Sequence, residues 1–389
     1  MINKDQARSV AALSAAEYAD VAALRHEIGL RVSAGDFDWV VGLGADIAGQ
    51  ATAEGGPSAN HLAVLGHLLR SLAGCAAPES LRALLRTPLS LSPDGRQRQR
   101  EERALAALVA HGQGAEDIER VVYGEQADTV HPREFRACLL HELVLTGTPV
   151  EDSPALLAFA HKLAVEGHPL AVLPLHLLPQ EQGLIRPDGA APDWTWAVSS
   201  LAGTFHSAAE LHDTPLMRER TAGIDMTEIS VPATAEVMGA AVRHWRTDSN
   251  GLIAAQDFWS PDPVPPQDFP AVFERLPLTP WEGERARLHP STAEEVFRIL
   301  LTAATRESAY GPGQHGAYGR LATWRSLAGL TGAPADAPVE RIAESVRQTH
   351  WFRPDPGPTW FYDIAWDLAV AALRPDGQGI AVLAATDTD

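Results

Sequence analysis

Amphipathic helical periodicity in the first half of the chain limits its possible folds more than any other feature. Apolar residues such as Val21, Leu24 and Ile28 recur at steps of three and four, which places them on one face of a helix. Several such segments end on glycine, a common residue just beyond a helix C-terminus. Helices joined by short loops in this way predict a stacked array of antiparallel pairs, HEAT-like or armadillo-like. A closed helical bundle is the alternative, because the sequence shows no sharp repeat period.

The distribution of tryptophan divides the chain into two parts. Trp39 is the single tryptophan of the first half, and the others begin at Trp194. A stretch with Gly and Pro at residues 183–192 separates the two parts, as a domain junction does. With 389 residues and 45% hydrophobic composition, the chain has enough apolar material for two cores. We therefore expect an α-helical repeat-like domain at residues 1–188 and an α+β domain at residues 189–389.

The second half carries signals for a small antiparallel sheet. Asn250-Gly251 is a strong hairpin signal, because a type I′ turn needs positive φ at both central residues, and apolar residues flank the pair. Residues 261–280 contain seven prolines, which exclude regular helix and central strand and predict an extended crossing segment. Residues 380–383 predict a buried strand. The expected fold class is therefore mainly α, with an N-terminal helical array followed by a C-terminal α+β domain.

Helices are also predicted in the second half. Ser291 and Glu294 form a capping-box pattern at the start of a helix that ends near Tyr310. Further helices are predicted over residues 320–330, from Pro338 onward, and over residues 359–373, TWFYDIAWDLAVAAL.

Three stretches of the C-terminal third form a distinctive pattern: GAYGRLATWRSLAGL, WFYDIAWDLAVAALRPDG and IAVLAATDTD. The pattern resembles an uncharacterised actinomycete family known as a domain of unknown function, most specifically over residues 296–389. The resemblance implies an actinomycete source, in keeping with the abundant Ala, Gly, Pro and Arg, and a single structural unit in the C-terminal part. It implies no catalytic residues, because the family has no assigned reaction.

A Gly-rich stretch at residues 309–319, AYGPGQHGAYG, contains a G-x-G-x-x-G pattern formed by Gly311, Gly313 and Gly316. A dinucleotide-binding fingerprint needs a strand before the glycines, whereas a predicted helix precedes them here, so this function is excluded. Two interpretations remain. The stretch is a connector in which glycine supplies positive φ, or it is an anion-binding loop with Arg320 beside it. We favour the connector.

Two aspartates, Asp363 and Asp367, lie four residues apart and would share one face of the predicted helix with Trp360. We expect them to pair with Arg320 or Arg325 inside the protein. A solvated face and a divalent metal bound through oxygen are the alternatives. With the loop, these side chains form a candidate pocket in the second domain. Its members are Tyr310, His315, Tyr318, Arg320, Arg325, Trp360, Asp363 and Asp367.

The last four residues, TDTD, carry Asp387 and Asp389. A frayed tail is the usual fate of such an end, and we favour it. The alternative is a strand that leads into a fixed acidic group at the edge of a sheet.

Composition excludes several classes of partner. A formal net charge of −19 opposes binding to nucleic acid and to anionic membrane surfaces. The sequence shows no apolar run long enough to span a bilayer and no signal-peptide layout, so we expect a cytoplasmic protein. Two cysteines are too few for a disulfide scaffold or a four-cysteine zinc site. We expect no metal and no cofactor.

Two functions of different class remain. The sequence contains no zincin, P-loop, kinase or G-x-S-x-G pattern, and helical arrays present extended binding surfaces. We therefore expect a non-enzymatic interaction or scaffold protein with a protein or peptide partner. The alternative is an enzyme of unassigned type, in specialised metabolism, with a small-molecule site in the C-terminal domain.

Overall fold

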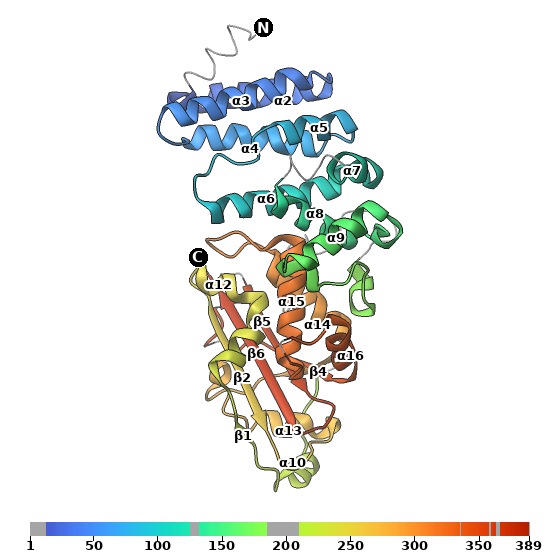
Figure 1. Cartoon of the computed structure of the whole chain (residues 1–389). Coiled ribbons are helices and arrows are strands. Elements are labelled where there is room, and N and C mark those ends of the chain that lie inside the picture. The colour runs from blue at the N-terminus through green and yellow to red at the C-terminus, as the bar shows by residue number, and fades with distance from the viewer. Residues whose placement is uncertain are drawn as a thin grey trace. The chain divides into compact units, whose positions relative to one another are not determined.

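The computed structural model describes residues 13–124, 132–184, 210–334, 336–357, 359–362 and 366–388. The chain divides between Ala171 and Val172 into two compact units (Figure 1). The expected domain boundary at residues 188 and 189 lies outside the described residues. The expected fold class, mainly helical with a C-terminal antiparallel sheet, is confirmed.

The first unit is helical in its described part. Its elements are η1 (Leu13–Ala15), α2 (Tyr18–Ser33), α3 (Phe37–Ala53), α4 (Ala59–Ala73), α5 (Pro78–Arg86), α6 (Gly95–Gly112), α7 (Ala115–Val122), α8 (Arg133–Leu145), η3 (Val150–Asp152) and α9 (Pro154–Val165), and η4 (Pro169–Val172) lies at the division between the units.

The long helices of the first unit form two layers. α2 packs on α4, α4 on α6, and α6 on α8, whereas α3 packs on α5 and α5 on α7 (Figure 1). Successive helices therefore alternate between the layers. Fully buried side chains such as Ile28, Leu43 and Leu68 fill the space between them. This arrangement agrees with the predicted helical array, in which each helix packs on the next member of its own layer.

The second unit contains a six-stranded antiparallel sheet in its described part. The strand order is β1-β2-β6-β5-β4-β3, so β6 lies between β2 and β5. The strands are β1 (Thr227–Glu228), β2 (Leu252–Trp259), β3 (Leu288–Ser291), β4 (His350–Pro354), β5 (Trp366–Leu373) and β6 (Gly379–Asp387). The helices are η5 (Pro179–Leu184), α10 (Pro215–Thr221), α11 (Pro232–Met238), η7 (Ala240–Val242), α12 (Arg243–Thr247), η8 (Pro266–Asp268), α13 (Phe269–Phe273), η9 (Thr279–Trp281), α14 (Ala293–Thr305), α15 (His315–Thr331) and α16 (Val339–Gln348).

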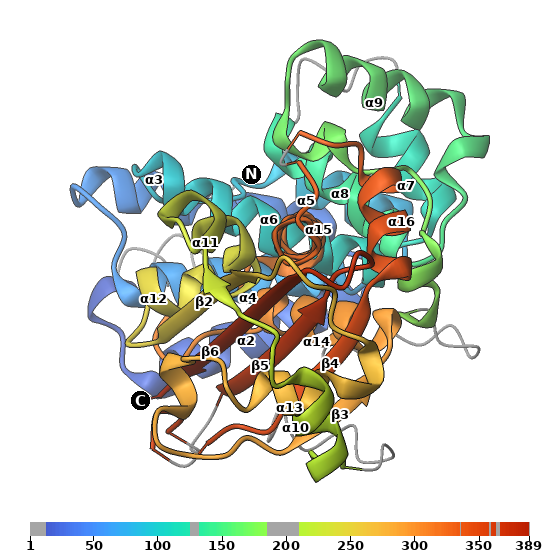
Figure 2. The ribbon, with the colours of Figure 1, turned by 90° about the horizontal axis from the view of Figure 1, so that it is seen from below.

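Both faces of this sheet are covered. On one face, alternate residues of β5 and β6 such as Ala371 and Val382 join a core cluster with Phe269, Phe273 and Trp281. On the other face, α14 and α15 contact β5. Figure 2 shows α15 on one side of the sheet and α13 on the other. Every residue of β6 is buried, as expected of a strand between two packed layers.

The helix predicted over residues 359–373 is wrong. Trp366–Leu373 is strand β5, which pairs with β6 along its length and with β4 near its C-terminal end. Because both faces are buried, its apolar residues lack the alternation that identifies a half-exposed strand. Asp363 lies outside the described residues, and Asp367 lies on β5. Asp367 therefore does not lie on a helix, and the predicted helix face shared with Asp363 is wrong.

The hairpin predicted at Asn250-Gly251 is also wrong. The residues before it form the short helix α12, and β2, which follows, pairs with β1 and β6. Gly251 does not have positive φ. It is required because a Cβ there would lie 2.8 Å from the Cβ of Trp245 and 2.9 Å from the carbonyl oxygen of Thr386. The turn packs a helix closely against the sheet instead of joining two strands.

Smaller differences concern the Pro-rich segment and the helix ends. Residues 261–280 contain the short helices η8 and α13 and the first two residues of η9. Each of these helices has a proline in its first turn, where a missing N–H breaks no helical hydrogen bond. The capping box of α14 consists of Thr292 and Glu295, one residue later than predicted, and the helix ends at Thr305, earlier than predicted. α15 begins at His315, ahead of its predicted start.

Candidate functional site

The Gly-rich stretch connects α14 to α15 and continues into the first turn of α15. Its glycines permit close packing and do not have positive φ. A Cβ on Gly313 would lie 2.0 Å from the carbonyl oxygen of Thr305, and one on Gly311 would lie 2.6 Å from the Cβ of Asp248. The stretch is thus the expected connector, but its glycines are required for close packing and not for positive φ.

Asp387 fixes this connector to the sheet. It is the last residue of β6, and its side chain is fully buried. One carboxylate oxygen accepts a hydrogen bond from Ser249 Oγ at 2.8 Å, and the other accepts one from the backbone N–H of Ala309 at 2.7 Å. The expected frayed tail is therefore wrong for Asp387, and Asp389 lies outside the described residues.

Arg320 binds a buried acid and is closed to solvent. Its Nε donates to Glu181 Oε1 at 2.6 Å, and its Nη2 donates to Glu181 Oε2 at 2.8 Å. Further hydrogen bonds reach the carbonyl oxygens of Pro174 at 2.9 Å and His176 at 2.8 Å. Because Arg320 is fully buried and engaged in this way, it does not meet an anion from solution. The anion-binding interpretation of the loop needed Arg320 as its cation, and Arg320 is paired with Glu181 instead.

The members of the predicted pocket do not share one surface. Arg320 and Asp367 are buried, whereas Tyr310 is 62% exposed and Arg325 is also exposed. Asp363 lies outside the described residues. The half-buried members are His315 and Tyr318 on α15, and Trp360, which packs edge-to-face on Phe361. The structure does not bring the described members together into one pocket.

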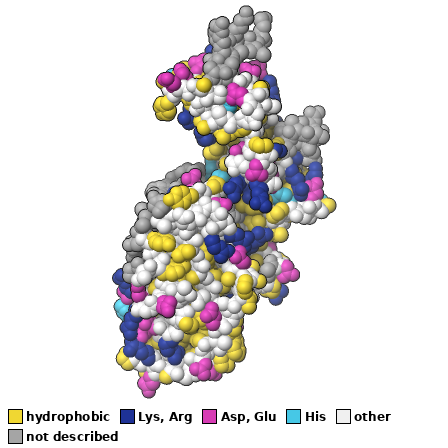
Figure 3. All heavy atoms as spheres, turned by 90° about the vertical axis from the view of Figure 1, so that its left-hand side faces the viewer, with side chains coloured by type: hydrophobic (Ala, Val, Ile, Leu, Met, Phe, Trp, Pro, Cys, Tyr) yellow, Lys and Arg dark blue, Asp and Glu magenta, His cyan; other side chains and the backbone are white. Residues whose placement is uncertain are grey.

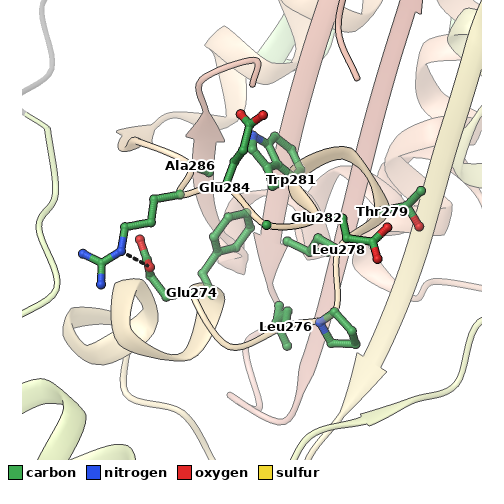
Figure 4. Close-up of a pocket in the computed structure, with 12 residues that line it drawn as sticks. Glu274, Leu276, Leu278, Thr279, Trp281, Glu282, Glu284 and Ala286 are labelled. Atoms are coloured by element: carbon green, nitrogen blue, oxygen red, sulfur yellow. Dashed lines mark ion pairs between the residues drawn. The ribbon is translucent and has the colours of Figure 1, made fainter. Parts of the chain in front are cut away.

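A pocket of about 630 Å³ lies elsewhere in the second unit, in the segment that runs from α13 through η9 toward β3 (Figure 4). Its floor is made of the buried apolar side chains Leu276 and Leu278. In Figure 4, Glu274, Glu282 and Glu284 spread around this floor. The pocket therefore combines an apolar base with an acidic rim.

The sheet holds the walls of this pocket in place. On β2, Gln256 accepts a hydrogen bond from the backbone N–H of Thr279 at 3.0 Å and donates to the carbonyl oxygen of Pro277 at 3.0 Å. The indole N–H of Trp281 donates to the carbonyl oxygen of Asp355 at 2.9 Å. These bonds anchor η9 and the turn before it, so the hollow is built into the fold.

The pocket lining has a surplus of negative charge. Its charged residues are three glutamates and Arg285, whose Nε lies 3.4 Å from Glu274 Oε2. Glu284 accepts a hydrogen bond from the hydroxyl of Thr359. Three carboxylates less one guanidinium leave a formal charge of −2. These residues are not among the site residues predicted from sequence, although LPLTPWEGER at residues 276–285 interleaves acids with an aromatic side chain.

The described residues contain no group of three or more His, Cys, Asp or Glu side chains placed to hold a metal ion. In the same part of the chain, no helix is both long enough and apolar enough to cross a membrane.

One family model covers almost the whole chain. It describes a family of unknown function, DUF6183, and it matches residues 22–389. The chain belongs to the DUF6183 family. No curated protein and no solved structure matches this DUF6183 chain. The resemblance of the C-terminal third to a family of unknown function is thus confirmed, and the match extends into both units of the DUF6183 fold.

Proposed function

We propose that this DUF6183 protein is a non-enzymatic interaction or scaffold protein that binds a protein or peptide through its helical array. The observation that carries the proposal is a set of exposed leucines on one layer. Leu30 on α2 is 53% exposed, Leu62 on α4 is 44% exposed, and Leu108 on α6 is 41% exposed. These helices pack side by side in one layer, which supports one extended partner that contacts all three helices.

The apolar contacts of such a partner would be distributed. Figure 3 shows hydrophobic side chains of the first unit in small groups among charged ones on the face turned to the viewer. Single exposed leucines are ordinary on a protein surface, but their recurrence along one layer supports a shared binding face. In this proposal the array is an α-solenoid.

We propose a cytoplasmic location and an actinomycete source for the protein. Cys75 and Cys138 are free thiols, which supports a reducing compartment. The net charge of −19 supports a protein or peptide partner over nucleic acid or a membrane. The abundance of Ala, Gly, Pro and Arg supports the actinomycete source.

The test combines affinity capture with titration. The wild-type chain and a Leu30→Glu/Leu62→Glu/Leu108→Glu variant are used as baits, and a captured protein is then purified and titrated against both. We expect the triple variant to lose at least about tenfold in affinity, because charges would enter an apolar contact. Leu157→Glu, at a 40% exposed leucine on α9, is the matched control. Equal binding by the triple variant would contradict the proposal, as would the absence of any partner.

The second candidate is an enzyme of unassigned type, in specialised metabolism, with its site in the second unit. The pocket of about 630 Å³ favours it, because small-molecule sites occupy roughly 300–1,000 Å³. Its polar groups would be Glu274, Glu282 and Glu284 instead of the residues first assigned. Incubation with a metabolite extract tests it. Consumption of a metabolite by the wild type but not by Glu282→Gln/Glu284→Gln would support the enzyme, and identical extracts would exclude it.

A further inference from the structure

The floor of the second-unit pocket is suited to an apolar ligand body. Leu276, Leu278 and Trp281 belong to the core cluster that covers the sheet, so their positions are set by packing. Trp281 is further fixed by edge-to-face packing on Phe273, with the ring centroids 5.9 Å apart, and by its hydrogen bond to the carbonyl oxygen of Asp355. A ligand entering this hollow meets side chains that are already ordered, which lowers the entropy cost of binding.

Among the described residues, the rim of the pocket carries more acids than cations. Glu282 is exposed, and within the described residues neither Glu282 nor Glu284 has an ion-pair partner. The arginines nearest the pocket pair with carboxylates other than Glu282 and Glu284. Arg285 lies beside Glu274, and Arg218 on α10 pairs with Asp213. In Figure 4 the two carboxylates lie on the rim on different sides of Trp281. Glu282 is exposed, and Glu284 accepts the hydroxyl of Thr359, so neither charge is balanced by a cation of the described residues.

We propose that this pocket binds a small organic cation, a primary amine or guanidinium carried on an apolar or aromatic body. The leucine floor takes the body, and Glu282 and Glu284 take the charged group. A neutral or anionic compound of the same shape would gain only the apolar contact. The inference requires a ligand site but no catalysis, and all of its residues lie in the second unit. Its test is therefore separate from the test of the helical array.

The experiment is calorimetric titration of the full chain with three indole compounds that differ in charge. Tryptamine carries an ammonium group, tryptophol a hydroxyl and indole-3-propionate a carboxylate on the same ring. We expect saturable one-to-one binding of tryptamine, about tenfold weaker binding of tryptophol, and no binding of indole-3-propionate. Raising the ionic strength should weaken the binding of tryptamine, because exposed charges are screened. Hydrogen exchange should slow in residues 273–286 when tryptamine is bound.

Variants locate the binding. Glu282→Gln and Glu284→Gln should each weaken tryptamine binding about threefold, and the double variant about tenfold, as expected for partly exposed ion pairs. Glu340→Gln, at an exposed glutamate on α16 of the same unit, is the matched control and should bind as the wild type does. Thermal unfolding checks that the variants are folded. The proposal is overturned by absence of saturable tryptamine binding, by equal binding of tryptophol, or by unchanged affinity in the double variant.

Discussion

Glu181 and Arg320 form a fully buried ion pair, with Arg320 Nε 2.6 Å from Glu181 Oε1. The indole N–H of Trp324 donates to the same oxygen at 2.8 Å, and the backbone N–H of Leu178 donates to the other carboxylate oxygen at 2.8 Å. Glu181 belongs to η5 and Arg320 to α15, so the pair holds the start of the second unit against the helix that covers the sheet. Both carboxylate oxygens of Glu181 thus accept hydrogen bonds from donors within the protein.

Removal of either partner should destabilise the second unit strongly. Arg320→Met leaves the Glu181 carboxylate buried without its cation, and Glu181→Gln leaves the guanidinium without its anion. Each should lower the free energy of unfolding by about 3–5 kcal/mol. In the double variant the loss should be smaller than the sum, with a coupling of about 2 kcal/mol. Urea denaturation followed by tryptophan fluorescence measures all three, and strictly additive losses would contradict a direct interaction.

The tight connector should not tolerate a side chain at Gly313. An added Cβ would lie 2.0 Å from the carbonyl oxygen of Thr305 and 2.5 Å from that of Arg306, so the backbone would have to move. Gly313→Ala should lower the free energy of unfolding by about 1–3 kcal/mol. Gly223→Ala is the control, because no atom lies within 4 Å of its added Cβ. Thermal unfolding compares them, and equal melting temperatures would argue against the close approach.

Acid should weaken the contact between Asp268 and Arg220. Asp268 is 1% exposed and accepts hydrogen bonds from Arg220 Nε at 2.9 and 3.1 Å. These bonds lower the pKa of Asp268 below its usual value. The folded state therefore favours the ionised form, so the contribution to stability is complete above the usual pKa of aspartate. It is lost as the pH falls through the lowered pKa of the folded state.

The variant Asp268→Asn isolates this contribution. It should lower the free energy of unfolding by about 1 kcal/mol at pH 7, and by progressively less below about pH 4. Urea denaturation of the wild type and the variant across this range gives the difference directly. If the difference in the free energy of unfolding stays constant down to about pH 3, Asp268 stabilises the fold by packing and not by charge.

The two cysteines should differ in reactivity. Cys138 is buried on α8, and burial raises the pKa of its thiol well above the usual value, whereas Cys75 is half-buried. Because the thiolate is the reactive form, iodoacetamide should modify Cys75 in the folded protein and Cys138 only after unfolding. Mass spectrometry of proteolytic fragments distinguishes the two sites. Equal labelling of both in the native protein would contradict the burial of Cys138.

The first unit was largely predictable from sequence because most of its described helices, although not the almost fully buried α8, have one buried face. Val21, Ile28 and Val32 of α2 are all buried, as their spacing indicates. The packing of α2 on α4 as well as on α3 agrees with the expected stacked array, because the apolar stripe of a helix must be buried against other elements.

Strand β5 was not predictable from its own residues. Its run of Leu368 to Leu373 is apolar and rich in alanine, a strong helix former, so local preference favours helix. Pairing with β6 on one side and β4 on the other overrides that preference. Because the apolar run is continuous and buried on both faces, its periodicity does not distinguish a strand from a buried helix.

The candidate site depended on contacts that sequence cannot display. Arg320 meets its partner Glu181, which lies 139 positions away in the chain, so no local pattern distinguishes it from a ligand-binding arginine. The acidic pocket needed Gln256 of β2 to fix the turn at Pro277 and Thr279. Only the assembled sheet places that side chain beneath the Pro-rich segment.

The place of β6 in the sheet sets an order for biosynthesis. β6 follows β2 and β5 in the chain, yet it lies between them. While the ribosome still holds Gly379–Asp387, β2 and β5 have no common partner, and their unpaired edges are open to wrong associations. The second unit therefore closes late, after these residues emerge. Because Asp387 also secures the connector at Ala309, the same late step completes the sheet and locks the turn between α14 and α15.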